Sequence, residues 1–392
     1  MKNKLHTEIY NIQIDELITY SKKHQLLKVD KSNFIFLLND NLDVFKSIED
    51  NLKVHNSSYF IEKNRSQKYP IIMNHFEKKY HKHFKKEHLR KINKLIYEGY
   101  ESFILNEIQI FFENNLNKNI NLIEEITKLY IKTNLEFNYE IKINNDDLYQ
   151  LYFFKDYYTL GLYLDVNLLE EYYSDSLFTN SLHTFQKIYD NFERVISSQL
   201  SLDIPKHHKI NDFYNNSIAG STNIAKSFAY LLTFVSEFKN DEILSNLNYL
   251  IPEYYRYIPL VHNHITSPYL FRKVGKKIKV DNELLSKNDN LFIFHTMENF
   301  DKEVFINPYK FDPSRWRGEI SKKINNTFGV SVHKCCGMSI ANIWLKSLIN
   351  IFFKNFLILN QKDLTEVPYS DKKEFNIILK QEKIIKIKKI IN

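Results

Sequence analysis

Two adjacent cysteines, Cys335 and Cys336, are the only cysteines of this 392-residue chain, and Gly337 follows them directly. A thiolate binds a metal well when backbone N–H groups of a tight loop, and the N-terminus of a helix behind it, lower the pKa of the thiol. Gly337 fits such a loop, and the apolar periodicity of Met338–Phe356 predicts the helix. The stretch Phe328–Gly337 therefore suits a metal-binding thiolate, and a thiolate that binds a heme iron donates electrons that favour cleavage of an O–O bond.

This segment resembles the heme-binding loop of the cytochrome P450 superfamily, whose pattern is Phe-x-x-Gly-x-Arg/His-x-Cys-x-Gly. Four positions match the pattern: Phe328, His333, Cys335 and Gly337. Ser331 stands where the pattern has its first glycine, and Cys336 stands where a proline is usual. A ligand at Cys336 would misplace the phenylalanine, the histidine and the last glycine together. The resemblance therefore implies that Cys335 binds the iron of heme b and that His333 meets a heme propionate.

Two buried cysteines that merely precede an amphipathic helix are the plainer alternative, and two upstream segments weigh against it. Glu253-Tyr-Tyr-Arg256 resembles the Glu-x-x-Arg of the family's K helix, and its spacing puts both charges on one helical face. Glu303–Trp316 resembles the family's meander, where Phe-Asp-Pro-x-Arg-Phe/Trp precedes the heme loop. The resemblance implies that Arg315 completes a buried structural network with Glu253 and Arg256.

The three segments follow one another in the family's own order, and the resemblance extends from Asp212 to the C-terminus. It implies the cytochrome P450 fold, which is mainly α-helical with a small β-sheet region. We expect a single domain over residues 1–392, because no Pro/Gly/Ser linker divides the chain. The heme is expected between an I helix at about residues 213–238 and the cysteine loop 328–337.

The expected I helix contains Ile218–Ala225, which resembles the family motif Ala/Gly-Gly-x-Asp/Glu-Thr. Ala219 and Gly220 are small enough for the backbone to approach a heme, and glycine permits a local opening of the helix. Ordinary close helix packing is the alternative for these two residues. Thr222 occupies the acidic position and Asn223 the alcohol position, so the usual acid-alcohol pair that delivers protons is absent.

Three reaction classes remain open at this point. A monooxygenase would oxidise a small organic substrate by hydroxylation or coupling, with O2 and with Thr222, Asn223 and water relaying protons. A peroxide-driven enzyme is the second class, although its fatty-acid members carry an arginine-proline pair where this chain has Thr222-Asn223. A redox-neutral heme-thiolate enzyme is the third. We favour the monooxygenase, and the unusual pair suggests secondary metabolism.

Further heme contacts are expected on histidines. His75-Phe-Glu-Lys-Lys79 is the nearest match to the family's His-x-x-x-Arg, with Lys79 in place of arginine. A plain surface histidine is the alternative for His75. His262 or His264 replaces the arginine that usually follows the K helix, or else both lie on an exposed strand.

We expect a reducing, cytoplasmic setting for this chain. The adjacent cysteines cannot close a disulfide loop, and no run in residues 1–40 resembles a signal peptide or a membrane anchor. The net charge of +7 is scattered along the chain, which favours a solvated surface over nucleic-acid binding. A non-enzymatic basic binding protein is the remote alternative, which salt-dependent DNA retention without heme would support.

Basic residues flank the cysteine loop, on the side from which electrons reach the heme in this family. They are Arg317, Lys322, Lys323, Lys334 and Lys346. An acidic ferredoxin or flavodoxin could dock there, because complementary charge speeds encounter. Ordinary solubilising lysines are the alternative.

Apolar periodicity predicts a predominantly helical chain. Helices are expected at Leu89–Leu105, Asn119–Thr133, Ser181–Leu200, Asn215–Phe238 and Met338–Phe356. Strands are expected at 375–380 and 383–388, paired with each other, and within Lys28–Leu38.

Overall fold

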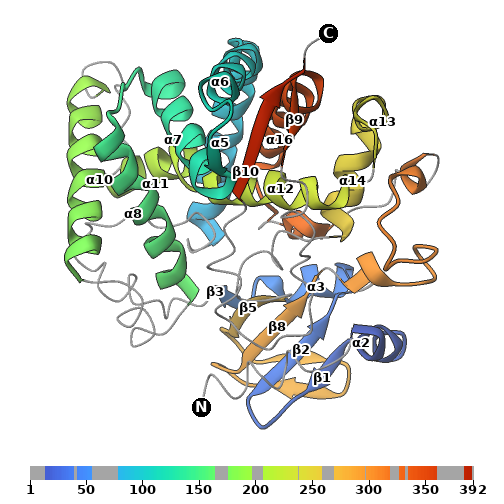
Figure 1. Cartoon of the computed structure of the whole chain (residues 1–392). Helices are drawn as coiled ribbons and strands as arrows, with labels where there is room; N and C mark the ends of the chain where they lie inside the picture. The colour runs from blue at the N-terminus through green and yellow to red at the C-terminus, as the bar shows by residue number, and fades with distance from the viewer. Residues whose placement is uncertain are drawn as a thin grey trace. The chain divides into compact units, whose positions relative to one another are not determined.

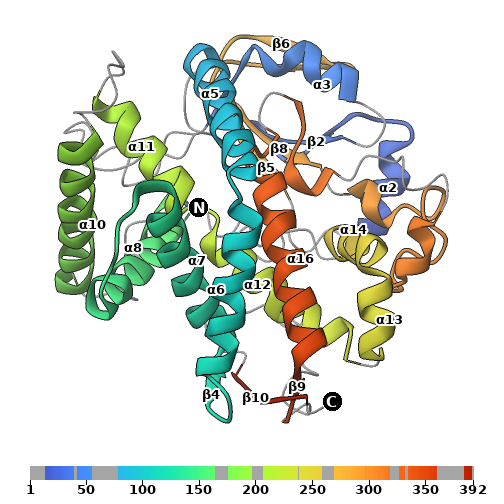
Figure 2. The ribbon, with the colours of Figure 1, turned by 90° about the horizontal axis from the view of Figure 1, so that it is seen from above.

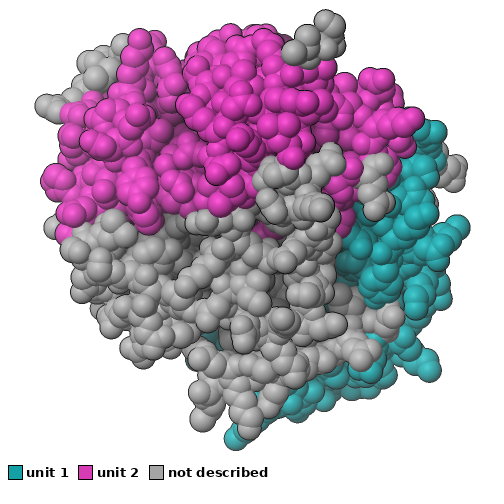
Figure 3. Space-filling view, viewed as in Figure 1, with its two compact units in different colours: residues 1–55, 248–335 teal, residues 56–247, 336–392 magenta. Residues whose placement is uncertain are grey.

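The computed structural model describes residues 14–38, 42–54, 78–163, 175–196, 206–236, 238–257, 269–295, 297–317, 326–331, 334–359 and 384–390. Their fold is mainly helical with small sheets, as the sequence predicted. The chain forms two compact units, each assembled from two segments (Figure 3). Unit 1 combines residues 1–55 with 248–335, and unit 2 combines 56–247 with 336–392. The expectation of a single domain over 1–392 stays a prediction.

A five-stranded sheet forms the centre of unit 1 (Figure 1). In spatial order its strands are β1 (Leu26–Lys28), β2 (Asn33–Leu37), β8 (Asn290–Phe294), β5 (Tyr269–Val274) and β3 (Leu52–Val54). β2 and β8 are parallel, with Ile35 opposite Phe292, and the other neighbours are antiparallel. The strands expected within Lys28–Leu38 are thereby confirmed.

Both faces of this sheet are covered. Alternate residues of a strand point to opposite sides of the sheet, so one strand contributes side chains to two cores. Phe34 and Phe36 of β2 join a core with α3 (Leu42–Glu49). Ile35 and Leu37 join a second core with α2 (Ile14–Ser21) and η3 (Met297–Phe300). The uninterrupted apolar sequence of β2 is therefore typical of a strand buried on both sides.

The rest of unit 1 is a hairpin and short helices. These are β6 (Ile278–Val280), β7 (Glu283–Leu285), η4 (Pro313–Trp316) and η6 (Asn326–Phe328). Helix α14 (Leu247–Tyr257) carries the Glu-x-x-Arg segment, and unit 1 holds all but its first residue.

Unit 2 is a helical assembly. Its helices are α5 (Lys78–Tyr97), α6 (Tyr100–Asn114), α7 (Leu122–Tyr139), α8 (Asn145–Tyr163), α10 (Asp175–Ile196), α11 (Lys206–Ser217), α12 (Ser221–Phe234), α13 (Asn240–Ser245) and α16 (Met338–Asn355). Helix α12 packs against α7 and α16, and α16 packs against α6 (Figure 2). A small antiparallel sheet consists of three strands, in the spatial order β4 (Asn119–Asn121), β10 (Ile384–Lys389) and β9 (Phe356–Ile358).

Several expected element boundaries are wrong. The single helix expected at Leu89–Leu105 is broken into α5 and α6 by Gly99, whose φ of +88° no helical residue adopts. The helix expected from Asn119 begins only after β4, where the Asn121 side chain caps α7. The helix expected over Asn215–Phe238 is interrupted at 218–220 and ends at Phe234. The strand expected at 375–380 lies outside the described residues.

The remaining predicted elements agree with the structure. Helix α16 covers Met338–Asn355, and β10 covers most of the second C-terminal strand. Among the residues that the structure describes, every helix is too short or too polar to traverse a lipid bilayer.

Candidate functional site

The cysteine loop reverses direction through two left-handed residues. Gly329 has a φ of +78° and Ser331 a φ of +55°. The turn brings the Cys335 N–H back to the carbonyl of Phe328, to which it donates at 2.7 Å. The Cys335 side chain is exposed, and that of Cys336 is half-buried. In the described part of the loop, Cys335 is therefore the more exposed of the two cysteines.

Helix α14 holds the start of this loop. The Thr327 hydroxyl donates to the carbonyl of Tyr255 at 2.6 Å, and the rings of Tyr255 and Phe328 lie edge to face at 4.8 Å. Burial, and after it the negative charge of Cys335, raises the pKa of the Tyr255 phenol above its ordinary value. Tyr255 is thus fixed against the loop and is electrostatically coupled to Cys335.

Glu253, on the same helix, is a fully buried carboxylate that accepts five hydrogen bonds. Arg256 donates to both oxygens, at 2.9 and 2.8 Å, and Arg315 Nε donates at 3.1 Å. The Trp316 indole N–H and the Asp312 backbone N–H complete the set at 2.9 and 2.8 Å. A buried carboxylate is stable only when its lone pairs are satisfied in this way. The structure therefore brings together the three residues expected to form a network.

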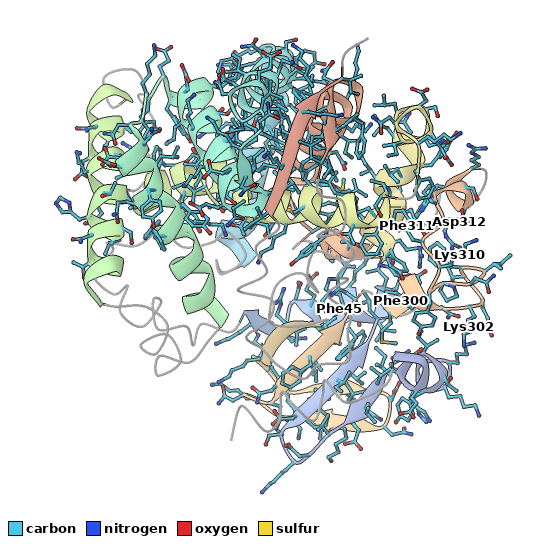
Figure 4. The ribbon with its side chains drawn as sticks, viewed as in Figure 1. Phe45, Phe300, Lys302, Lys310, Phe311 and Asp312 are labelled. Carbon is cyan, nitrogen blue, oxygen red and sulfur yellow. The ribbon has the colours of Figure 1, made fainter. Side chains whose placement is uncertain are left out.

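The two arginines fix the meander through its backbone carbonyls. Arg256 donates to the carbonyls of Asn299 and Pro308, at 2.6 and 2.8 Å. Arg315 donates to those of Ile306 at 2.7 Å and Lys310 at 3.0 Å. Figure 4 labels Lys310 and Asp312, two residues of this segment whose backbone groups bind the network. An irregular segment is thus held by guanidinium groups instead of by regular secondary structure.

The network also reaches the cysteine loop. Asn299, whose carbonyl binds Arg256, donates from its side chain to the Thr327 hydroxyl at 3.4 Å. Thr327 in turn donates to Tyr255, which lies between Glu253 and Arg256 on α14. The ion pair and the loop are therefore parts of one continuous hydrogen-bonded arrangement within unit 1.

The expected oxygen-side residues lie in unit 2, at the break between α11 and α12. Ile218 and Ala219 both donate their backbone N–H groups to the carbonyl of Tyr214, at 2.9 and 3.0 Å, so the turn is wider than an α-helical one. A Cβ atom added to Gly220 would lie 3.2 Å from the Tyr130 hydroxyl oxygen. Gly220 therefore leaves room for the Tyr130 hydroxyl, which would have to shift to accommodate a side chain at this position.

Thr222 and Asn223 follow this break on the first turn of α12. The Thr222 hydroxyl and the Asn223 Oδ1 atom are buried, and neither has a hydrogen-bond partner in the described part of the chain. Buried polar atoms without partners are rare and often mark a site that binds water or a ligand. These two atoms are available to such a molecule.

The remaining predicted site residues are only partly described. Phe328 is buried, and Gly337 is the N-cap of α16. His333, His75, His262 and His264 lie outside the described residues, as do the side chain of Lys79 and all of Lys322 and Lys323. Of the other flanking basic residues, Arg317 and Lys346 are exposed and Lys334 is half-buried.

Sequence reasoning missed three contributors to the site. Asn299 and Thr327 link the ion pair to the loop, and Glu49 accepts a hydrogen bond from the Ser331 hydroxyl at 2.6 Å. The sequence offered one signal that Ser331 has a partner. Serine stands where the family pattern has glycine, and a non-glycine residue in a left-handed conformation needs a compensating contact.

Comparisons with known proteins agree with this geometry. Residues 239–388 match the family model described as Cytochrome P450. "Ent-kaurenoic acid oxidase 2" from Arabidopsis thaliana is 32% identical over 89 residues, which cover 22% of this chain and 17% of that protein. "Probable cytochrome P450 508A1" from Dictyostelium discoideum is 26% identical over 192 residues, covering 44% of this chain and 38% of that protein. The matched segments thus span well under half of these curated relatives.

Solved structures extend the likeness to the whole fold. The chain is similar to P450BioI, solved "in complex with hexadec-9Z-enoic acid ligated Acyl Carrier Protein", with a TM-score of 0.69 and 14% sequence identity. The similarity covers 91% of this chain and 94% of that one. The fold of this chain is therefore that of the cytochromes P450.

Proposed function

We propose that this chain belongs to the cytochrome P450 superfamily and is a heme-thiolate monooxygenase, because residues 239–388 match the family model and the fold is that of the cytochromes P450. It oxidises a small organic substrate, by hydroxylation or oxidative coupling, with O2 and electrons from a separate ferredoxin- or flavodoxin-type donor. The observation that carries the proposal is the buried Glu253–Arg256–Arg315 network, which is tied through Asn299 and Thr327 to the loop of Cys335. A network of this extent serves to fix the path of the loop, and a fixed loop is what an iron-binding thiolate requires.

The described residues fit a heme. In unit 1, the exposed Cys335 offers a sulfur of the kind that binds a heme iron. In unit 2, the buried Thr222 hydroxyl and Asn223 Oδ1 have no hydrogen-bond partner among the described residues, so a bound polar molecule would supply one. Cys335 would bind the iron, and His333 would meet a propionate. When bound, a thiolate-ligated heme supplies the activation of dioxygen for oxidation of the substrate.

The protein's own contribution to proton delivery rests on Thr222 and Asn223 in place of an acid and an alcohol. The Thr222 hydroxyl can donate and accept, and Asn223 Oδ1 can accept a hydrogen bond from water. Both atoms are buried, so an ordered water between them would be held away from bulk solvent. We propose that this pair holds the water through which protons reach the reacting oxygen.

A peroxide-driven reaction is the second candidate, because Thr222 and Asn223 lack the carboxylic acid that usually assists proton delivery. Purified enzyme supplied either with a reductase system and O2 or with peroxide separates the two candidates. Product that requires the reductase supports the monooxygenase, and product from peroxide alone supports the second candidate. Long-chain acids such as hexadec-9Z-enoic acid, which is ligated to the acyl carrier protein in the P450BioI complex, form the first substrate panel.

The decisive experiment is the carbon monoxide difference spectrum of the reduced protein, recorded for Cys335→Ser and, as a matched control, Cys336→Ser. We expect the far-shifted Soret band of a thiolate-ligated heme in the control and its loss in Cys335→Ser. A band that survives loss of Cys335 and disappears with Cys336 would move the ligand to Cys336. The absence of the band from the unaltered protein would refute the proposed function.

A further inference from the structure

We propose that Glu49 is a positioning residue of the cysteine loop. It holds Ser331 in the left-handed conformation that a glycine would adopt without help. The proposal rests on the proposed function in one respect, because it concerns a loop whose cysteine is taken to bind heme iron. Glu49 lies at the C-terminal end of α3, far from the loop in sequence and within the same unit.

Ser331 has a conformation that disfavours its own side chain. Its φ of +55° places the Cβ atom close to the backbone carbonyl, a strain that glycine does not have. The neighbouring left-handed residue is a glycine, Gly329, which adopts its φ of +78° freely. The strain at Ser331 must therefore be offset by contacts of Ser331 with the surrounding structure.

The Glu49 carboxylate supplies such a contact. Its Oε2 atom accepts a hydrogen bond from the Ser331 hydroxyl at 2.6 Å, a short distance typical of a hydroxyl on a charged oxygen. Glu49 is only 7% exposed, so the bond is shielded from competing water. Its other oxygen, Oε1, is buried without a hydrogen-bond partner in the described ranges. Among the described residues, Ser331 is therefore the hydrogen-bond donor to this buried carboxylate.

Helix α3 is a firm support for this contact. Val330, next to Ser331, is buried in the same core as Phe45 and Ile48 of α3, and Figure 4 labels Phe45. Asn51, which lies between α3 and β3, accepts a hydrogen bond at 2.7 Å from the N–H of Gly275, the residue after β5. An apolar contact at Val330 and a polar one at Ser331 thus attach two successive loop residues to one helix.

The conformation of Ser331 sets the path of the chain into the cysteine. Its carbonyl accepts a hydrogen bond from the Lys334 N–H at 3.2 Å, and the next residue, Cys335, bonds back to Phe328. If Ser331 left the left-handed region, its carbonyl would turn and this bond would break. Glu49 therefore acts on Cys335 through Ser331, without needing to touch the cysteine.

A double-mutant cycle tests the proposal with four full-length proteins: the unaltered chain, Glu49→Ala, Ser331→Gly and the double variant. In the heme-loaded proteins the readout is the fraction of the reduced carbon monoxide complex that shows the thiolate Soret band. In the heme-free proteins it is the unfolding equilibrium constant from denaturant titration. We expect Glu49→Ala to lower the thiolate fraction and to raise the unfolding constant about tenfold. Glu49→Ala should have little effect when residue 331 is already glycine.

Two further variants complete the design. Glu49→Gln keeps an oxygen acceptor of the same shape, so it should retain most of the thiolate band. Lys46→Ala, an exposed residue of the same helix, should behave as the unaltered protein does. If Glu49→Ala reduced the thiolate band and the stability equally whether residue 331 is serine or glycine, Glu49 would not act through Ser331. That result would overturn the proposal. So would a Glu49→Ala protein with an unchanged band and unchanged unfolding.

Failure of the proposed function would look different. In that case the unaltered protein would bind no heme through a thiolate, whereas the unfolding cycle of the heme-free proteins would still report the Glu49–Ser331 coupling. Additive unfolding effects in that cycle would overturn the positioning role by themselves.

Discussion

The Nε1–H group of Trp344 donates to the hydroxyl of Tyr100 at 2.7 Å, and Tyr100 donates onward to Oδ1 of Asn134 at 2.7 Å. Trp344 and Tyr100 are fully buried. The Asn134 amide continues the chain by donating to the carbonyl of Tyr130 at 2.8 Å. One buried chain of hydrogen bonds thus joins α16, α6 and α7, and burial raises the pKa of the Tyr100 phenol well above its ordinary value.

Removing the Tyr100 hydroxyl should destabilise the protein, because the hydrogen-bond partners of the hydroxyl stay buried and become unpaired. In Tyr100→Phe the Trp344 N–H remains buried without an acceptor, and we expect a loss of about 1–3 kcal/mol in the free energy of unfolding. Denaturant titration measures it. Trp344→Phe removes the donor as well, so the double variant should lose less than the sum of the two single changes. Strict additivity would contradict the contact.

Breaking the buried ion pair should be far more costly than changing a surface charge. Glu253→Gln removes the charge that balances Arg256, and we expect a loss of about 3–5 kcal/mol. Heme incorporation should fall with it, because the network holds the cysteine loop. Glu242→Gln, on the exposed surface of α13, is the matched control and should lie within about 0.5 kcal/mol of the unaltered protein. Normal heme content in Glu253→Gln would argue against this support.

A methyl group at the helix break should be tolerated only when Tyr130 is shortened. Gly220→Ala places a carbon 3.2 Å from the Tyr130 hydroxyl oxygen, and overpacking of this kind costs about 1–3 kcal/mol. In a Tyr130→Phe background the same change should be neutral or stabilising, because alanine favours helix more than glycine does. Thermal unfolding of the four proteins provides the comparison. The same penalty in both backgrounds would rule out the contact with the hydroxyl.

Replacing Thr222 by valine should separate folding from chemistry. The Thr222 hydroxyl has no partner in the described part of the chain, so Thr222→Val should leave the heme-free protein equally stable or about 1 kcal/mol more stable. If Thr222 holds a proton-carrying water, the loaded enzyme should release more peroxide per molecule of product. Oxygen uptake, peroxide and product measured together test this expectation. Unchanged coupling in both Thr222→Val and Asn223→Thr would remove the pair from the reaction.

Stability should fall in mild acid because of His88. Burial lowers the pKa of this histidine from 6.5 to about 4, with Lys91 opposing and Asp212 favouring its protonation. The unfolded chain therefore binds a proton between pH 6.5 and about 4 while the folded chain does not, so the free energy of unfolding decreases as the pH falls through this window. The full effect corresponds to about 3 kcal/mol.

Unfolding titrations from pH 7 to pH 4 measure this slope. His88→Gln cannot titrate, so its profile should be flatter than that of the unaltered protein by the contribution of one proton. If the stability of both proteins depended on pH in the same way, the acid sensitivity would come from groups other than His88.

Short motifs made part of this structure predictable. Glu253 and Arg256 are three residues apart on a helix, and the position of Cys335 follows from neighbours within its own loop. The contact between Ser331 and Glu49, by contrast, joins residues 282 positions apart, and no local pattern marks Glu49 as a partner. The same holds for Trp344 and Tyr100, which are 244 positions apart.

Helix boundaries failed where a single residue overrides periodicity. The apolar pattern continues through Gly99 without interruption, yet the left-handed backbone of this glycine ends α5 and starts α6. Periodicity indicates which face of a helix is buried. It does not indicate whether the helix continues through a glycine, which adopts right-handed and left-handed backbone conformations with equal ease.

The parallel pairing of β2 with β8 has a consequence for how this protein is made. β2 leaves the ribosome more than 250 residues before its partner at Asn290–Phe294. Until then the β1–β2 hairpin carries apolar side chains on both faces and an uncovered edge, which is a template for aggregation. A nascent chain of this design needs its early strands shielded for most of translation, and a fragment that ends before β8 should be recovered mainly as insoluble protein.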